Sequence, residues 1–153
     1  MAILNRGNGR TGWSKIFKAC VYARLYEAEI SHELIADVLE TRTHGNLWTT
    51  HPPFQIDANF GFAAAVNEML AQSHMGYIQL LPALPKAWPE GSVKGMRLRG
   101  GYELDMTWTD GVLEEAVIRN ISAKGSCEIR YGKGDKTLEI PKGGEVVLTA
   151  KSF

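Results

Sequence analysis

The hydrophobic periodicity of this 153-residue chain changes near its middle, and this change restricts the fold more than any other feature. Between Thr11 and Arg42, apolar residues recur every three or four positions, as they do on one face of an α-helix. After residue 90 they tend to alternate with polar residues, in short segments rich in β-branched and aromatic side chains. A helical half followed by a strand-rich half predicts an α+β fold.

The first half of the chain predicts about three helices. One begins after Thr11, and a second follows Ser31, which is a favoured N-cap residue. A third fits residues 60 to about 73, with Asp57 or Asn59 at its N-terminus. The apolar stripes behind these predictions are Trp13, Ile16, Phe17, Cys20, Val21 and Leu25; Leu34, Ile35, Val38 and Leu39; and Phe62, Ala65, Val66, Met69 and Leu70.

The second half predicts an antiparallel sheet or sandwich. Turn residues separate its strand-like segments, and Asp110-Gly111 is the clearest case because this pair suits a two-residue primed hairpin turn. No helical segment lies between the strands, so neighbours are expected to pair antiparallel. The Pro-rich stretch 81–89 is the expected junction, and it divides the chain into residues 1–75 and 76–153. The predicted strands are residues 93–99, 102–109, 112–120, 126–132, 136–140 and 145–150.

Charge and hydropathy argue against two classes of partner. The chain has 17 Lys plus Arg and 17 Asp plus Glu, so its formal net charge is zero and no basic excess is available to neutralise nucleic-acid phosphates. The apolar runs are too short to span a bilayer, and no signal peptide is visible. We therefore expect neither a nucleic-acid nor a membrane partner.

The sequence predicts no metal and no cofactor. Residues 7–12, GNGRTG, have GxGxxG spacing, but a dinucleotide site needs a preceding strand within a parallel βαβ unit, and only residues 2–5 offer a strand. The four histidines lack metal-ligand spacing. Cys20 and Cys127 lie far apart and outside any CxxC pair, so we interpret them as reduced structural thiols.

The stretch HPPFQIDANFG, residues 51–61, is the strongest candidate for a functional site. Its two prolines remove backbone donors and exclude a helix interior or a central strand, so a stiff loop is expected. The loop carries an imidazole, an amide and a carboxylate, and Trp48 and Phe54 offer a flat apolar face, which together are the groups of a sugar pocket. Asp57 has two interpretations, because Asp is also a favoured helix N-cap.

Longer motifs then carry a resemblance to a known family. The segments GRTGWSKIFKACVYARL, THPPFQIDANFG and EMLAQSHMGYIQLLPALPKAWPEGSVKGMRLRGGYELDMTW, in this order, resemble the C-terminal portion of glycoside hydrolase family 95. This family contains α-L-fucosidases and some relatives that act on α-L-galactosides. The resemblance runs from about Gly9 to about Glu115 and is rich in Trp, Pro, His and Gly at matching places.

The resemblance implies an architecture and a mechanism. The family has a β domain, a central (α/α)6 barrel with the active site and a C-terminal β domain, so this chain is expected to supply the last barrel helices and that β domain. A glutamic acid protonates the leaving oxygen, while an aspartate polarises the asparagines that activate water for inversion. Asp57 matches this aspartate in the context Q-I-D-x-N-F-G, and His51 matches a sugar-contacting histidine. Ala58 stands where a glycine is usual.

These matches lead to a functional expectation with alternatives. Asp57 is the expected catalytic residue, with His51, Gln55 and Asn59 as substrate-binding residues and a fucosylated or galactosylated oligosaccharide as substrate. The general acid and the catalytic asparagines are expected upstream in a larger, secreted or periplasmic enzyme, so the chain should be a fragment without activity of its own. The alternatives are a carbohydrate-binding module using Trp88, Tyr102 and Trp108, or a module that self-associates through exposed helix surfaces carrying Trp13, Phe17, Phe54 and Phe62.

Overall fold

The computed structural model describes residue 7 and residues 9–121 and 125–153, and the strand considered at residues 2–5 lies outside these ranges. The chain divides into two compact units, one ending at Leu70 and one beginning at Ala71, and each is described by itself. The boundary predicted at residue 75/76 therefore falls within the second unit.

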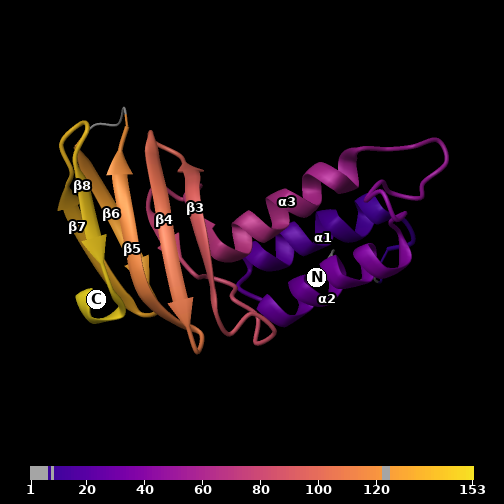
Figure 1. The fold of residues 1–153 in the computed structure, drawn as a ribbon, viewed down its shortest axis with the longest axis horizontal. Coiled ribbons are helices and arrows are strands. Elements are labelled where there is room, and N and C mark those ends of the chain that lie inside the picture. Colours follow the sequence, from indigo (N-terminus) through magenta and orange to yellow (C-terminus); the bar gives the residue numbers. More distant parts are fainter. Residues whose placement is uncertain (1–6, 8, 122–124) are drawn as a thin grey trace. The chain divides into compact units, whose positions relative to one another are not determined.

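The first unit contains the three helices that the periodicity predicts (Figure 1). They are α1 (Gly12–Arg24), α2 (Ala28–Thr41) and α3 (Asp57–Leu70). Helix α1 packs against both of the others, and ion pairs join Lys15 to Asp37 of α2 and Arg24 to Glu68 of α3. The buried apolar side chains agree with the predicted stripes in part: of the α1 stripe only Ile16 is buried, while Trp13, Phe17 and Leu25 are exposed and α1 instead buries the small residues Ala19 and Ala23. In α2 and α3 the buried apolar side chains include Leu34, Ile35, Val38, Ala65 and Met69.

Ser31 does not cap α2, which corrects the prediction made for it. The helix begins at Ala28, after Glu27 in the N-cap position, so Ser31 lies in its first turns. The side chain is fully buried, and its Oγ donates a hydrogen bond to the carbonyl oxygen of Ala19 at 3.0 Å. Because Ser31 faces α1, its hydroxyl bonds to that helix and not to the free N–H groups at the start of α2.

Gly61 allows α1 and α3 to approach closely. A Cβ at this position would overlap Cγ2 of Ile16, which is 2% exposed. The Gly61 carbonyl oxygen also accepts a hydrogen bond from Sγ of Cys20 at 3.6 Å. The glycine is thus required by helix packing, within α3, where its propensity is poor.

We expect Gly61→Ala to lower the free energy of unfolding. Overpacking of a close contact costs about 1–3 kcal/mol, which outweighs the gain of about 1 kcal/mol that alanine brings to a helix interior. Chemical denaturation followed by circular dichroism measures the difference. Gly45→Ala is the matched control, because a Cβ there meets no atom within 4 Å. Equal stability of the two variants would contradict the packing role of Gly61.

The second unit is a sandwich of two four-stranded sheets (Figure 1). One sheet has the order β3-β4-β5-β8 and the other the order β1-β2-β6-β7. The Asp110-Gly111 turn between β4 and β5 has positive φ at both residues, as expected for a primed turn. The strands are β1 (Ala71–Gln72), β2 (Ile78–Leu80), β3 (Gly91–Leu98), β4 (Tyr102–Thr109), β5 (Val112–Asn120), β6 (Ser126–Tyr131), β7 (Gly134–Glu139) and β8 (Glu145–Leu148), followed by a 3-10 turn at Ala150–Ser152.

The sandwich core forms between the two sheets. Along β4 every second side chain is buried, which gives the row Tyr102, Leu104, Met106 and Trp108. Hydrogen bonds between described residues join the sheets: for example, the Tyr102 hydroxyl donates to the carbonyl oxygen of Ser126 at 3.1 Å, and Leu113 N–H donates to the Tyr131 hydroxyl at 3.0 Å. The predicted α+β class, with an antiparallel-rich sandwich after the helices, is confirmed.

One strand pairing differs from the all-antiparallel expectation. Strand β2 pairs parallel with β6, and Ile78 lies opposite Ile129. Strand β1 occupies residues 71–72, which the prediction had assigned to the end of the third helix, so α3 ends at Leu70 and not near residue 73. Strand β2 precedes the predicted junction at residues 81–89 and was not among the predicted strands. The other pairings between the described strands are antiparallel.

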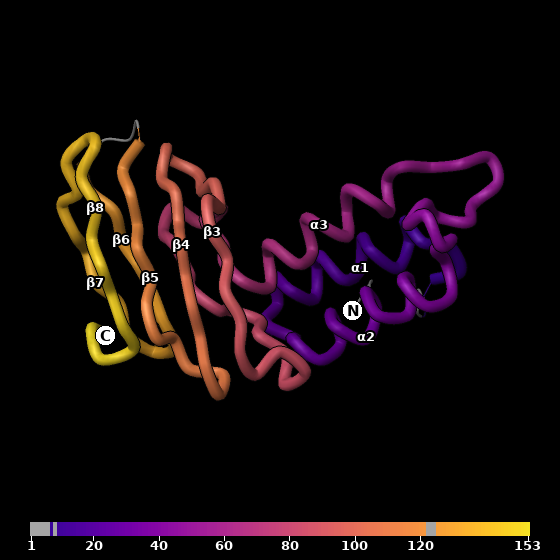
Figure 2. Tube along the Cα trace, in the orientation of Figure 1, coloured from indigo at the N-terminus to yellow at the C-terminus, as the bar shows by residue number. Residues whose placement is uncertain are grey.

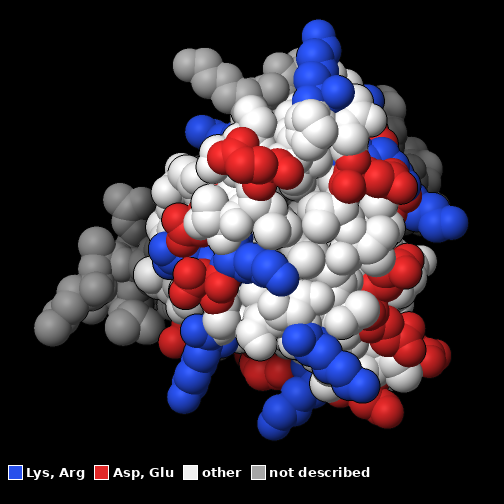
Figure 3. Space-filling model, turned by 90° about the vertical axis from the view of Figure 1, so that its left-hand side faces the viewer, with Lys and Arg blue, Asp and Glu red and all other residues white. Residues whose placement is uncertain are grey.

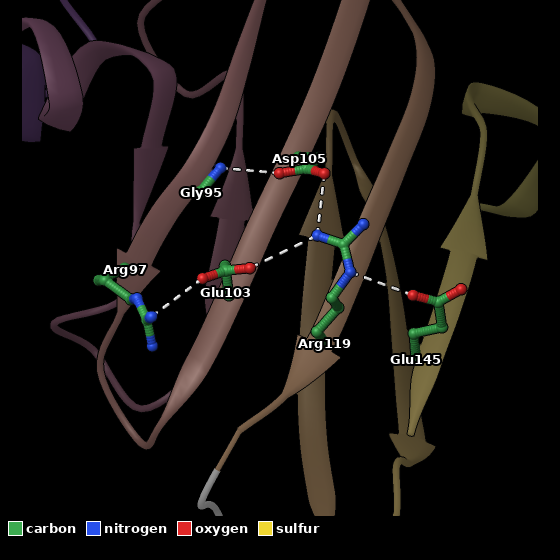
Figure 4. Close-up of polar contacts among 6 residues, drawn as sticks. All are labelled: Gly95, Arg97, Glu103, Asp105, Arg119 and Glu145. Atoms are coloured by element: carbon green, nitrogen blue, oxygen red, sulfur yellow. Dashed lines mark hydrogen bonds and ion pairs between the residues drawn. The ribbon is translucent and has the colours of Figure 1, made fainter. Parts of the chain in front are cut away.

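A polar network covers part of the outer face of the β3-β4-β5-β8 sheet (Figure 4). The Arg119 guanidinium lies 2.8 Å from Asp105, 3.5 Å from Glu103 and 3.1 Å from Glu145. The second Asp105 oxygen accepts a hydrogen bond from Gly95 N–H at 2.7 Å, at the bulge of β3. The Gly95 N–H and then Arg119 lower the pKa of Asp105, so the carboxylate holds the bulge over a wide pH range.

Charged groups of both signs are interspersed on the face drawn in Figure 3, without a continuous area of one sign. This agrees with the balanced composition. No helix in the described ranges is long and apolar enough to cross a membrane.

Candidate active site

The predicted functional stretch, residues 51–61, comprises the last part of the loop between α2 and α3 and the first turn of α3, at the end of the helical unit where α1 begins (Figure 2). The first part of the loop precedes this stretch and folds back on itself as a small hairpin. His44 N–H donates to the carbonyl oxygen of Trp48 at 2.7 Å, and Thr50 N–H donates to that of Arg42 at 2.9 Å. The peptide bond between Pro52 and Pro53 is cis. The loop is therefore built by its own backbone hydrogen bonds.

Side chains then fasten this loop to α3. The Asn59 amide nitrogen donates to the carbonyl oxygen of Leu47 at 2.7 Å, and the Thr49 hydroxyl donates to that of Gln55 at 2.8 Å. The start of α1 lies against the same place, because a Cβ on Gly12 would be 3.2 Å from Cβ of Ala58. Sequence reasoning missed the role of Thr49, for which only its place beside a proline-rich loop offered a signal.

Asp57 is the first residue of α3, and its side chain is exposed. The carbonyl oxygen of Ile56 accepts the Phe60 N–H at 3.1 Å, so Ile56 occupies the N-cap position. Within the described part of the chain, no hydrogen bond or ion pair engages the Asp57 carboxylate. A free, charged acceptor thus lies at the edge of the loop.

His51 is half-buried, and its ring is oriented by the loop itself. Its Nδ1 lies 3.1 Å from the carbonyl oxygen of Pro53. Because a carbonyl oxygen only accepts, Nδ1 carries the hydrogen, and Nε2 of the neutral ring remains an acceptor. This arrangement suits an imidazole that receives a hydrogen bond from a hydroxyl group.

Gln55 and Asn59 differ from the other two predicted site residues because their side-chain oxygens are buried. Gln55 Oε1 and Asn59 Oδ1 have no hydrogen-bond partner among the described residues. The Asn59 amide nitrogen is already used by Leu47. The structure therefore brings all four predicted residues to one loop, and it gives Asn59 a structural contact that the sequence did not indicate.

A cavity of about 200 Å³ lies beneath this loop. Its walls are mostly apolar, and Asn59 and two threonines supply the polar lining. It is lined by Val38, Leu39, Thr43, Leu47, Thr49, Ala58, Asn59 and Phe62.

The β unit has a larger cavity, of about 320 Å³, whose lining includes none of His51, Gln55, Asp57 and Asn59. It is lined by Ser73, Gly76, Tyr77, Ile78, Arg99, Gly100, Tyr102, Ser126 and Cys127. Burial raises the pKa of the Cys127 thiol, and burial also raises that of Cys20 in the helical unit. Both cysteines are free, and raised pKa values make them poor nucleophiles, in agreement with structural thiols.

Two aromatic residues proposed for carbohydrate binding in the β unit are part of its core. Tyr102 and Trp108 are each 5% exposed. Trp108 Nε1 donates to the carbonyl oxygen of Trp88 at 3.0 Å, which satisfies its polar atom inside the sandwich. Neither ring presents a face on which a sugar stacks.

The described ranges contain no group of three or more His, Cys, Asp or Glu side chains that could hold a metal ion.

Comparison with known families assigns both units to one class of protein, the glycoside hydrolases. Residues 1–70 match the glycosyl hydrolase family 95 catalytic domain, and residues 72–152 match the glycoside hydrolase family 95 C-terminal domain. The chain therefore belongs to glycoside hydrolase family 95, and the resemblance found in its motifs is confirmed.

Individual relatives agree with this assignment. The chain is 44% identical to alpha-L-fucosidase 2 of Arabidopsis thaliana over 72% of its length. It is 33% and 34% identical to the probable alpha-fucosidases A of Aspergillus niger and Aspergillus oryzae, over 81% and 80% of its length. The chain spans 14% of the plant relative and 18% and 20% of the fungal ones.

Proposed function

We propose that this chain carries part of the active site of an inverting α-L-fucosidase-like glycoside hydrolase, which removes terminal α-L-fucosyl or α-L-galactosyl groups from oligosaccharides. One observation carries the proposal: the Asp57 carboxylate is exposed at the first turn of α3, free of hydrogen bonds to the described residues, on the loop that also holds His51. The names of the relatives support fucosides as substrates.

Asp57 acts in this proposal by polarising an amide. Inversion requires an acid on the leaving-group side of the sugar and an activated water on the other side. An asparagine amide is a weak base, and it needs a charged acceptor at its NH2 group to draw a proton from water. A carboxylate with both oxygens available meets this need, whereas one committed to capping a helix does not.

The neighbouring side chains bind and orient the sugar. His51 Nε2 is an acceptor for a sugar hydroxyl, because Nδ1 is held by Pro53. Gln55 and Asn59 belong to the same substrate-binding set, and Asn59 also holds the loop in place through Leu47. Their side-chain oxygens are buried and have no partner among the described residues, so contact with a substrate requires that the loop expose them in the complete active site.

A polypeptide of these 153 residues alone should not hydrolyse fucosides. The loop and helix start, residues 42–59, contain a single carboxylate, Asp57. Inverting hydrolysis needs a second group about 6.5–9.5 Å away to protonate the leaving oxygen. We therefore expect no fucose release from 2'-fucosyllactose by the isolated chain.

The same residues should support turnover in a complete enzyme. The experiment replaces the matching segment of the Arabidopsis relative with this chain and measures fucose release from 2'-fucosyllactose. Turnover by the graft together with an inert isolated chain is the expected result. An isolated chain with ordinary enzymatic turnover, or a well-folded graft without any, would contradict the proposal.

The exposed apolar helix surfaces also belong to this proposal. Trp13, Phe17 and Phe54 are 48%, 55% and 40% exposed, while Phe62 is half-buried. Contiguous apolar surface of this kind is typical of an interface. We propose that it packs against further parts of a catalytic domain, or against a second copy when the chain is alone.

A further inference from the structure

Trp48 and Phe54 form an aromatic pair on either side of His51 in the sequence. Their ring centroids are 4.5 Å apart and their planes make an angle of 23°, so the rings are stacked. The loop brings them together: its hairpin holds Trp48, and the turn closed by His51 and Pro53 returns the chain to Phe54. Two residues separated by a diproline thus share one surface.

The pair is fixed in place and yet open. Trp48 N–H donates to Oδ1 of Asn46 at 3.1 Å, and Leu47, its neighbour, is held by Asn59 of α3. Trp48 remains 55% exposed and Phe54 40% exposed. Exposed stacked rings that the backbone holds in position lose little conformational entropy on binding.

We propose that the Trp48–Phe54 pair is a stacking platform for a galacto-configured pyranose ring. In such a ring the axial O4 lies on one face, and the hydrogens of C3, C4, C5 and C6 form an apolar patch on the other. A rigid aromatic surface beside hydrogen-bonding groups complements this patch. The inference rests on the proposed function for its choice of sugar class, which includes L-fucose, L-galactose and D-galactose.

The charges around the pair agree with a neutral ligand. Residues 45–56 contain no Asp, Glu, Lys or Arg, and His51 is their one ionisable side chain. Leu47 and Ile56 on the same loop are also apolar and exposed, at 67% and 48%. The polar groups of the sugar are then left to His51 and Asp57.

The test is a titration of the 15N-labelled 153-residue chain, observed through the indole N–H signals of its four tryptophans. The probes are L-fucose, which represents the sugar that the enzyme removes, and methyl β-D-galactoside, which represents the sugar to which the fucose is attached. Methyl β-D-glucoside is the stereochemical control, because its equatorial O4 breaks the apolar patch. We expect at least one galacto-configured probe to shift the Trp48 signal more than the glucoside does.

Trp13 is the matched internal control, since it is 48% exposed but lies on α1. Its signal should stay in place at every sugar concentration. Phe54→Ala should weaken binding about 2- to 12-fold, the range expected for loss of one aromatic contact, while Phe54→Tyr should retain it. Circular dichroism verifies that the helices persist in both variants.

Several results would contradict the proposed stacking role of the Trp48–Phe54 pair. They are an unshifted Trp48 signal, equal shifts with galactoside and glucoside, equal shifts of Trp48 and Trp13, or a Trp48 signal that depends on protein concentration and not on sugar. The last result would mean that a second copy covers the pair. The two proposals can fail separately. A graft that does not hydrolyse fucosides would refute the proposed function, whereas a sugar-dependent shift of the Trp48 signal would still support the stacking role.

Discussion

Replacing Asp57 by asparagine in the grafted enzyme should lower kcat about a thousandfold, within the range of general-base and electrostatic effects. The substitution removes the negative charge and keeps the shape of the side chain. An amide no longer polarises a neighbouring asparagine, so the attacking water loses its activation. Because the loss concerns the transition state, KM should change little. Initial rates of fucose release from 2'-fucosyllactose give both constants.

The activity and stability of the Asp57→Asn variant together distinguish a catalytic role of Asp57 from a helix-capping role. Asparagine is as good a cap as aspartate, so a capping role predicts full activity and unchanged stability. Loss of a charge from the first turn of α3 costs about 0.3–1 kcal/mol, which a thermal melt resolves. Glu40→Gln provides the control, since Glu40 is an exposed acid at the end of α2. A fully active Asp57→Asn graft would leave Asp57 without a catalytic role.

Trp108→Ala should lower the free energy of unfolding of the β unit by about 3–5 kcal/mol, as for other buried large-to-small substitutions. The ring is 5% exposed and covers Gly91, where a Cβ would overlap it. Truncation leaves a cavity in the core and removes the hydrogen bond from Trp108 Nε1 to the carbonyl oxygen of Trp88. Trp108→Phe should cost less, because most of the apolar contact remains.

Chemical denaturation followed by the β-structure signal measures these differences. Trp13→Ala is the control and should change stability by no more than about 0.5 kcal/mol, as is usual for exposed positions. A stable Trp108→Ala variant that loses affinity for glycans would instead support the carbohydrate-binding alternative.

The regular elements were predictable because local signals and tertiary packing agree. Strand β4 matches its predicted range, Tyr102–Thr109, since its alternation is strict and the Asp110-Gly111 turn ends it. The existence of the three helices was predictable in the same way, but the face that α1 buries was not, because Ala19 and Ala23 are buried while Trp13 and Phe17 are exposed. Ser31 shows the limit of such signals. It is a favoured capping residue, but its hydroxyl donates to the carbonyl oxygen of Ala19 on another helix.

The loop that carries the proposed site stands out in the sequence, whereas its contacts do not. Two prolines, a histidine and an aspartate identify the loop from composition alone. The hydrogen bonds from Asn59 to Leu47 and from Thr49 to Gln55 depend on how the loop folds back, which residue types do not encode. The stacking of Trp48 on Phe54 is of the same kind.

The parallel pairing of β2 with β6 also affects how the β unit is assembled during synthesis. The hairpins β3–β4 and β4–β5 join neighbouring segments, so each closes a short loop soon after it leaves the ribosome. Strand β2 is made before all of them, but its partner β6 is made after them. Ile78 and Leu80 are buried in the finished fold. Their strand can pair with β6 only after β6 has left the ribosome. Strand β2 is thus translated early in this unit but is among the last to complete its pairing.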